Sequence, residues 1–339
     1  MQRVVRSHLD SKRLTLPLLA LCAGVATLGH AQAAPLTTAA PEIFAPGIIS
    51  GPASDGAPTF TPDSKTLYFE RTGGSWGFIL ESHLRNGRWS QPTIASFSGL
   101  WSDSQPALSP DGSRLVFVSW RPTVPTTGMS ADAIKALPRA AAMWEVRRTP
   151  GGWSDPVRLA ETVNISPRVF KPSIAGNGNL YFMAKTDSAP TFRLYRSEYR
   201  NNTYLKAEPL DFSDGNHTDV DPGVGPDESF LIFSSAGRAG PDDTHEHLYI
   251  TFRSGAGWGS IQPLRYAGDY EKNPTDDGEA QLGRDNRTLY FTSGRASPIH
   301  ADRTRAQAAE DFARLNLWDN GNSNVWTISL APWLDAVRS

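Results

Sequence analysis

Acidic residues recur at one fixed position along the chain, three residues before the proline or alanine that anchors a repeated motif. They are Asp55, Asp103, Asp219 and Asp277, and a further repeat has Val169 at this position. Each repeat also has one cation at or soon after the end of its second apolar segment, namely Arg71, Arg121, Lys185, Arg238 and Arg295. Such a set can form ion pairs, or it can present charges to a ligand.

Two interpretations of this charged set remain open. In the first, the acids and bases pair between neighbouring repeats and hold the loops, and an exposed pair of this kind contributes little to stability. In the second, some acids have no basic partner and form a site for a cation, a sugar or a basic segment of a partner. The residues expected to bind a ligand or partner are Asp55, Asp103, Asp219, Asp277, Arg121, Arg238 and Arg295.

Histidines near the fourth repeat are weak candidates for a metal site. They are His217, His245 and His247, close to Asp219 and Asp221. The last two lack the i, i+4 helical spacing of a zinc protease, so at most these two imidazoles could converge in an extended segment. We expect no cofactor, with a divalent cation such as calcium as the alternative.

A pair of carboxylates provides a catalytic alternative. Asp221 and Glu279 each stand one residue before the anchor of consecutive repeats. Two carboxylates at a suitable distance can act as acid and base in glycoside hydrolysis. The chain has no phosphate-binding glycine loop, and the repeated units use up most of its length, which argues against a fused hydrolase domain.

The elements that position these residues follow from the repeat itself. Pro58-Thr59-Phe60-Thr61-Pro62-Asp63 begins the first copy, and further copies begin near residues 105, 171, 221 and 279. Each copy contains an apolar strand, a Pro-Asp or Asn-Gly type of turn, a second strand with alternating aromatics, and two more short strands. Four strands in each repeated unit predict a propeller blade.

The fifth repeat lacks its outer strand, whereas an unpaired apolar segment lies near the start of the chain. We therefore expect residues 41–49 to complete the fifth blade and close the ring, which removes exposed sheet edges. The predicted fold is all-β: a five-bladed β-propeller of four-stranded blades, closed by the N-terminal strand and spanning residues 34–339.

The copies resemble the TolB-like, WD-repeat-like β-propeller family, whose repeats carry a Pro-x-Phe-Ser-Pro-Asp-Gly-x-x-Leu-x-Phe pattern. The resemblance covers most of the chain after residue 33. It implies a propeller that works on the periplasmic or cell-surface side, usually by contact with a partner.

Two insertions interrupt this pattern, and both fall in loops between the second and third strands of a blade. They span residues 120–142 and 295–323. By topology they lie on the face that carries the recurring acids and flank the first blade. Ser130 is a candidate helix cap, and residues 302–317 are rich in Ala, Arg, Glu and Gln. We expect the insertions to contribute to binding, and Trp101, Trp120 and Trp318 to line the same face.

The first 33 residues predict a signal peptide, with four basic residues before an apolar run and cleavage near Ala33. Cys22, the only cysteine, permits a lipoprotein as an alternative. Without this leader, 29 basic and 34 acidic residues remain of 33 and 35. This mildly acidic balance argues against a nucleic-acid partner.

The sequence therefore predicts a soluble, monomeric periplasmic protein without a membrane span after cleavage, with secretion as an alternative. We expect a binding module for a protein or saccharide partner that uses the face with the insertions. The alternative is a carbohydrate-active hydrolase with Asp221 and Glu279 at the axis.

Overall fold

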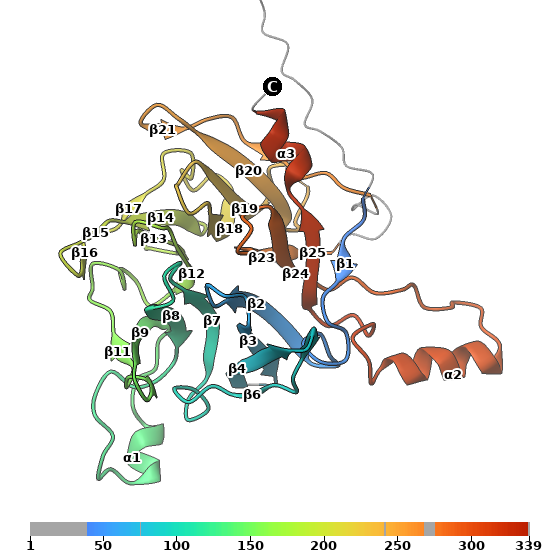
Figure 1. Cartoon of the computed structure of the whole chain (residues 1–339), viewed down its shortest axis with the longest axis horizontal. Coiled ribbons are helices and arrows are strands. Elements are labelled where there is room, and N and C mark those ends of the chain that lie inside the picture. Colours follow the sequence, from blue (N-terminus) through green and yellow to red (C-terminus); the bar gives the residue numbers. More distant parts are fainter. Residues whose placement is uncertain (1–38, 75, 241, 268–274, 338–339) are drawn as a thin grey trace, which may run out of the picture. The chain divides into compact units, whose positions relative to one another are not determined.

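The computed structural model describes residues 39–74, 76–240, 242–267 and 275–337. Five antiparallel sheets follow one another along the chain and stand around a common axis as propeller blades (Figure 1). The predicted fold class is therefore confirmed. The predicted leader and Cys22 lie outside the described residues. Within the described part of the chain, no helix has the length and apolar character needed to cross a membrane.

Each blade begins at the axis with the strand that carries the repeated motif and continues outward. Blade 1 comprises β2 (Ser54–Phe60), β3 (Thr66–Gly73), β4 (Trp76–Arg85), β5 (Arg88–Trp89) and β6 (Thr93–Ile94). Blade 2 comprises β7 (Asp103–Leu108), β8 (Arg114–Ser119), β9 (Ala142–Thr149), β10 (Gly152–Trp153) and β11 (Val157–Arg158). The third strand thus pairs with two short outer segments in succession.

The remaining blades follow the same plan. Blade 3 comprises β12 (Val169–Ile174), β13 (Leu180–Ala184), β14 (Arg193–Ser197) and β17 (Glu208–Pro209), with a small hairpin of β15 (Tyr199–Arg200) and β16 (Thr203–Tyr204). Blade 4 comprises β18 (Thr218–Val224), β19 (Phe230–Ala236), β20 (His247–Ser254), β21 (Gly257–Trp258) and β22 (Gln262–Pro263). Blade 5 comprises β23 (Asp277–Leu282), β24 (Thr288–Ser293), β25 (Asn324–Ser329) and β1 (Glu42–Ile43).

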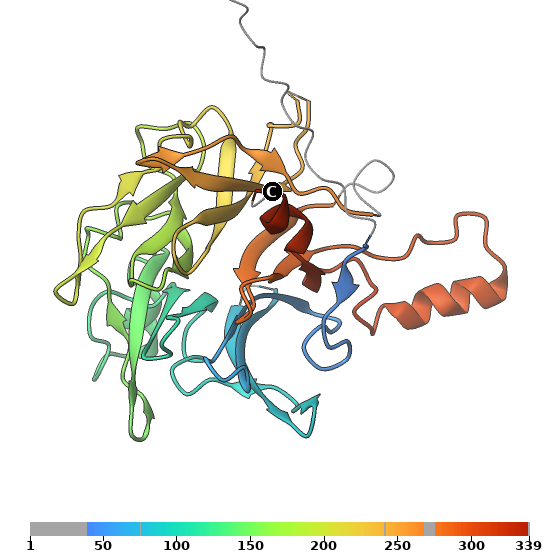
Figure 2. The ribbon, with the colours of Figure 1, turned by 45° about the horizontal axis from the view of Figure 1, so that its top comes forward.

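The ring is closed by the N-terminal strand, as predicted. Strand β1 pairs antiparallel with β25, so that Glu42 faces Thr327 and Ile43 faces Trp326. Helix α3 (Ala331–Ala336), which the sequence analysis did not anticipate, follows β25 and buries Trp333. The two ends of the propeller therefore meet on one blade (Figure 2).

The turns between the first and second strands have the predicted mechanism in all five blades. The side chain of an Asp or Asn accepts a hydrogen bond of 3.0 Å from the backbone N–H two residues later. These residues are Asp63, Asp111, Asn177, Asp227 and Asp285. A side chain that bonds its own backbone in this way fixes a tight turn.

The hydrophobic core consists of separate layers, each between two neighbouring blades. Blades 5 and 1, for example, share Ile49, Phe60, Leu67 and Val325, whereas Trp333 of α3 joins the layer between blades 4 and 5. Since every blade buries both of its faces, side chains of both alternations along its strands are apolar.

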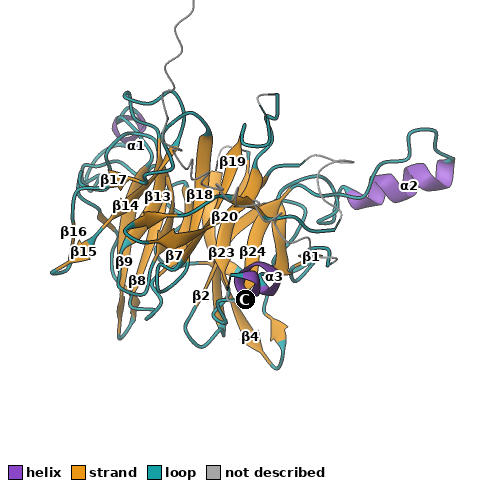
Figure 3. Ribbon diagram, turned by 90° about the horizontal axis from the view of Figure 1, so that it is seen from above, coloured by secondary structure: helices purple, strands orange, loops and turns teal. Residues whose placement is uncertain are grey.

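The two insertions leave the propeller from the ends of β8 and β24 and carry helices at the periphery of a body of strands (Figure 3). Helix α1 (Ala131–Lys135) begins after Ser130, whose side chain accepts a hydrogen bond from Ala133 N–H, as expected. Helix α2 (Arg305–Arg314) begins after Thr304 with a capping box to Gln307, and it projects from the side of the propeller.

Candidate functional site

The recurring acids form buried ion pairs with the recurring arginines. Four such pairs constitute what we call the Asp–Arg ring: Asp55–Arg71 (2.5 Å), Asp103–Arg121 (2.8 Å), Asp219–Arg238 (2.7 Å) and Asp277–Arg295 (2.5 Å). At most 1% of each aspartate is exposed. Blade 3 differs because Val169 replaces the acid, and Lys185 therefore has no carboxylate at this position.

The ring corrects one expectation in detail. Each pair lies within a single blade and not between blades. Asp55 is the direct partner of Arg71 across β2 and β3. In the other three pairs a serine faces the aspartate, and the arginine follows that serine by two or three residues. The arginines do hold the loops, because Arg71 donates to Ile49 O (3.1 Å) and Arg121 donates to Phe97 O (3.3 Å). Each of the four acids has an arginine partner, so the interpretation with unpaired acids at these positions is wrong.

Two residues further along each inner strand, the chain makes the same β-bulge in every blade. The residue at the bulge has a positive φ between 44° and 55°, and these residues are Ala57, Gln105, Lys171, Asp221 and Glu279. The register of each first strand shifts here. A bulge changes the direction of a side chain, and a non-glycine residue in this region is strained.

These bulges direct polar side chains into the axis, where they meet across the ring. Gln105 of blade 2 donates through Nε2 to Glu279 Oε1 of blade 5 (3.1 Å). Lys171 of blade 3 donates through Nζ to Ala280 O of blade 5 (3.2 Å). Asp221 Oδ2 accepts the backbone N–H of Glu279 (2.9 Å). The axis is therefore filled by side chains at this level.

Two carboxylates from outside the inner strands complete this group. Glu70 of β3 accepts the backbone N–H of Gln105 at Oε2 (2.7 Å). Glu246, in the loop before β20, has Oε2 at 3.6 Å from the position of a β-carbon on Gly278, and Asp221 Oδ2 lies at 2.6 Å from the same position. We call Glu70, Gln105, Lys171, Asp221, Glu246 and Glu279 the axial cluster. Gly278 lets the two acids of blade 4 approach the next blade.

Burial and the proximity of other acids raise the pKa values of three carboxyl groups in the axial cluster. Burial, followed by the charge of Glu279, raises the pKa of Glu70 well above its usual value. The same two causes raise the pKa of Asp221 to about 6. Burial and then Asp221 raise the pKa of Glu246 to about 8, while burial lowers the pKa of Lys171. The cluster is therefore less negative at neutral pH than four carboxyl groups imply.

A cleft of about 530 Å³ opens above the axial cluster on the face with the insertions. Its floor includes Glu70 and Gln105, and aromatic side chains line its walls. This aromatic cleft is defined by Trp76, Trp101, Trp120, Phe170 and Arg139, together with the two floor residues. Trp120 packs against Phe170 with ring centres 6.0 Å apart. Two of the three tryptophans expected on this face thus line the cleft, whereas Trp318 packs on Trp326.

The histidines of blade 4 do not converge. His247 Nε2 lies 2.6 Å from Asp243, whereas His245 Nδ1 lies 3.3 Å from Asp276, so the two imidazoles have different carboxylate partners. The backbone carbonyl of His217 accepts from the Thr191 hydroxyl. Among the described residues, no group of three or more possible ligands is arranged to hold a metal ion.

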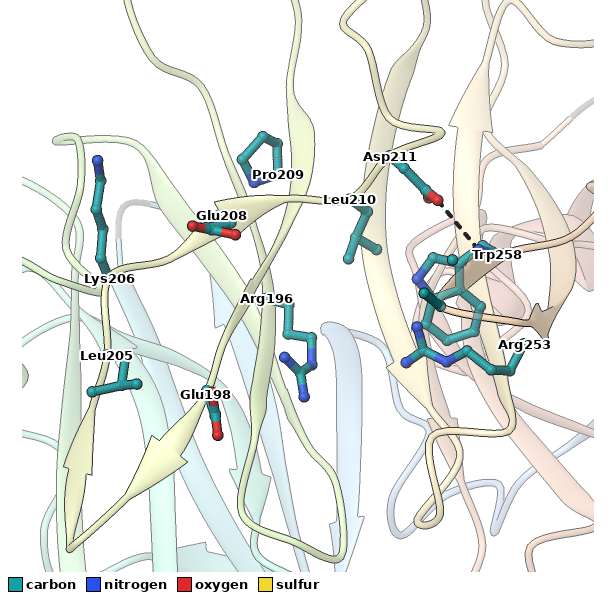
Figure 4. A pocket seen from close by; sticks show the side chains of 12 residues that line it. Arg196, Glu198, Leu205, Lys206, Glu208, Pro209, Leu210, Asp211, Arg253 and Trp258 are labelled. Carbon is teal, nitrogen blue, oxygen red and sulfur yellow. Dashed lines mark hydrogen bonds between the residues drawn. The ribbon is translucent and has the colours of Figure 1, made fainter.

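A second hollow, of about 720 Å³, lies at the rim between the outer parts of blades 3 and 4 (Figure 4). Three of its charged side chains, Arg253, Asp211 and Arg196, have partners within the protein. Arg253 lies over the Trp258 ring at 4.0 Å, Asp211 accepts the Trp258 backbone N–H (3.3 Å), and Arg196 pairs with Glu228 (2.9 Å). The lining of this rim groove contains one aromatic ring, that of Trp258, whereas the lining of the aromatic cleft contains four.

Comparison with known proteins bears on the fold. No family model matches the chain, and no curated protein matches it in sequence. Among solved structures, an α-L-arabinofuranosidase from Lactobacillus brevis aligns with a TM-score of 0.51 and 11% identity, over 84% of this chain and 92% of that one. A putative TolB from Agrobacterium tumefaciens aligns with a TM-score of 0.46 and 14% identity, over 82% and 91%.

The fold is a five-bladed β-propeller. Two structures described as TolB are among the solved structures that align with it. A TolB from Acinetobacter baumannii also aligns, with a TM-score of 0.45 and 13% identity over 71% of this chain, which spans about half (51%) of that protein.

The sequence analysis did not identify several residues of the site. Gln105 and Lys171 stand one residue before their anchor prolines, as Asp221 stands before Pro222, so extending the same rule to every repeat would have found them. Glu70 and Glu246 come from a second strand and a loop, where no repeated position marks them. No repeated position marks the cleft residues Arg139, Trp76 and Phe170, because only the folded insertion and blades bring them together.

Proposed function

We propose that the protein binds a saccharide in the aromatic cleft. The observation that carries this proposal is the lining of the cleft: three indoles and a phenyl ring surround a polar floor. Sugar rings have apolar faces that pack on aromatic rings and hydroxyl groups that require hydrogen-bond partners. A few polar groups at the bottom of an aromatic pocket are typical of a small-molecule site.

The floor supplies groups of both hydrogen-bonding kinds. The pKa of Glu70 is raised, which favours the protonated acid and gives a donor as well as an acceptor. The side chain of Gln105 is fixed by its bond to Glu279. Trp76, whose surface is 47% exposed, forms an open edge at which a longer chain could continue. The binding of one or a few sugar units fits a cleft of this size.

We further propose that binding takes place on the periplasmic side. The predicted leader supports this location. No cysteine follows residue 33, so folding in the periplasm would not require the formation of a disulfide.

Titration calorimetry against a panel of oligosaccharides tests the binding function. We expect Trp101→Ala and Trp120→Ala to abolish or strongly weaken binding, because each removes a ring from the wall. Trp318→Ala, which removes an indole on the same face but outside the cleft, is the matched control and keeps its affinity. Binding that survives both cleft variants would contradict the proposal. A protein captured only by the form with both insertions would favour a protein partner.

Hydrolysis of the saccharide is a second candidate function. The observation that favours it is a pair of unlike carboxyl groups near the cleft floor. Glu70 has a raised pKa, as a general acid requires, while Glu279 accepts hydrogen bonds from Gln105 (3.1 Å) and Thr292 (2.8 Å). Asp221, the other acid expected from the sequence, is 7% exposed and does not line the cleft. Glu70 with Glu279 therefore fits this role better than Asp221 with Glu279.

Release of reducing ends from the same panel measures this activity. If the protein is a hydrolase, Glu70→Gln and Glu279→Gln each abolish release, while the binding of substrate is retained. An absence of release from every saccharide that binds would leave a binding protein without catalysis.

A further inference from the structure

Arg139 is placed differently from the other arginines on its face. It follows α1 in the insertion between β8 and β9, and its guanidinium carbon lies 5.4 Å from the centre of the Trp101 ring. It is the only cation among the described residues that line the cleft. The arginines of the Asp–Arg ring also lie over aromatic rings, but each has a buried carboxylate as partner.

The guanidinium of Arg139 is available to a ligand. The side chain is exposed, and it takes part in none of the ion pairs formed among the described residues. An arginine presents several N–H groups in a rigid plane that matches the two oxygens of a carboxylate. Contact with an aromatic ring restricts the orientation of this plane without using those donors.

We propose that Arg139 selects acidic saccharides, by binding the carboxylate of a uronic acid unit whose ring lies in the aromatic cleft. This inference rests on the proposed binding function and specifies its ligand. The carboxylate is placed at the rim of the cleft, next to Trp101, and the hydroxyl groups of the sugar face Glu70 and Gln105.

The acids beneath the cleft do not oppose this assignment. Burial, followed by repulsion from neighbouring acids, raises the pKa of both Glu246 and Glu70 and so favours their neutral forms. Lys171 brings a basic group to the same cluster. An anion at the rim therefore faces one free cation and a floor with reduced negative charge.

The test compares each acid with its own neutral form. Oligosaccharides of galacturonic, glucuronic and mannuronic acid, and their methyl esters, are titrated into the full chain after leader removal. We expect at least one acid to bind about tenfold tighter than its ester. Arg139→Gln should remove this preference by weakening the binding of the acid about tenfold more than the binding of the ester, while Arg139→Lys should restore part of the preference.

Lys135→Gln is the matched control, because it removes a cation from the same insertion outside the cleft lining, and it should behave as wild type. Equal binding of acid and ester, or an unchanged preference in Arg139→Gln, would overturn the inference. If acid and ester bind equally well and in a Trp101-dependent manner, the proposed function stands while the assignment to Arg139 fails. If no saccharide of either kind binds, both fail.

Discussion

On three inner strands an aspartate of the Asp–Arg ring lies two residues before a member of the axial cluster, yet the ring and the cluster give their buried carboxyl groups different partners. In the ring, each carboxylate has one arginine and is almost fully buried. In the cluster, four carboxyl groups surround one lysine, and burial followed by repulsion between the acids raises the pKa values of Glu70, Asp221 and Glu246. The ring is suited to hold the blades and loops, whereas the cluster keeps acids in an environment that disfavours their charge. Perturbed acids beside a cleft are typical of functional sites.

The largest expected effect comes from breaking one pair of the ring. Asp219→Asn should lower the free energy of unfolding by about 3 to 5 kcal/mol, because it leaves Arg238 buried without its counter-charge. Denaturant unfolding measures this. The control is Glu161→Gln in a surface pair with Arg158, which should cost no more than about 1 kcal/mol because 74% of the Glu161 side chain is exposed. Similar losses in both variants would remove the distinction between ring and surface pairs.

The second prediction concerns the pH dependence of stability. Glu246 has a raised pKa in the folded protein, of about 8 against 4.5, so the folded state holds its proton longer than the unfolded state. Its contribution is therefore complete below about pH 4.5 and is lost as the pH rises through 8. Burial is the main cause of the raised pKa of Glu246, and the charges of Asp221, Asp276 and Glu279 raise it further.

In Glu246→Gln, the loss of unfolding free energy between pH 5 and 8 should accordingly be about 3 to 4 kcal/mol smaller than in wild type. Unfolding curves at a series of pH values measure it. Glu208→Gln, which removes an exposed acid from β17, serves as the control for loss of one charge. A wild-type slope in Glu246→Gln would show that Glu246 is not part of the crowded group.

A smaller effect is expected from adding one methyl group beside the axial cluster. In Gly278→Ala the new β-carbon would lie 2.6 Å from Asp221 Oδ2, which is too close for an ordinary contact. The expected destabilisation is about 1 to 2 kcal/mol. Gly73→Ala meets no atom within 4 Å and is the control. Thermal unfolding compares the two, and equal midpoints would mean that Asp221 can withdraw from Gly278.

The smallest effect should come from neutralising an acid of the axial cluster. Asp221→Asn keeps an oxygen that can accept the Glu279 N–H but removes a charge that burial and Glu279 disfavour. We expect the free energy of unfolding at pH 8 to change by less than about 1 kcal/mol. Measured beside Asp219→Asn, this variant tests the comparison directly. A loss as large as that of Asp219→Asn would show that both layers depend on their charges for stability.

The sequence was sufficient to predict the blades, the turns, the ring closure and the helix cap at Ser130, because each depends on local spacing or on a repeated motif. It identified the acids and bases of the ring but not their pairing within a blade, which depends on the register of each hairpin. The bulges were not predictable from residue type, since Gln, Lys, Asp and Glu seldom adopt a positive φ. The axial cluster therefore became visible only when strands from five blades were placed around one axis.

Closure of blade 5 by β1 also determines the order in which the propeller can fold. The hydroxyl of Ser50, shortly after β1, donates to the carbonyl oxygen of Val325 in β25, 275 residues away. The N-terminal segment can therefore make its contacts with blade 5 only after β25 has been synthesised. Contacts between such distant parts of a chain slow folding. A nascent or truncated chain leaves the edges of its outermost blade open to other chains. A chaperone or protease that acts on this protein would therefore encounter its most vulnerable form just before β25 is complete.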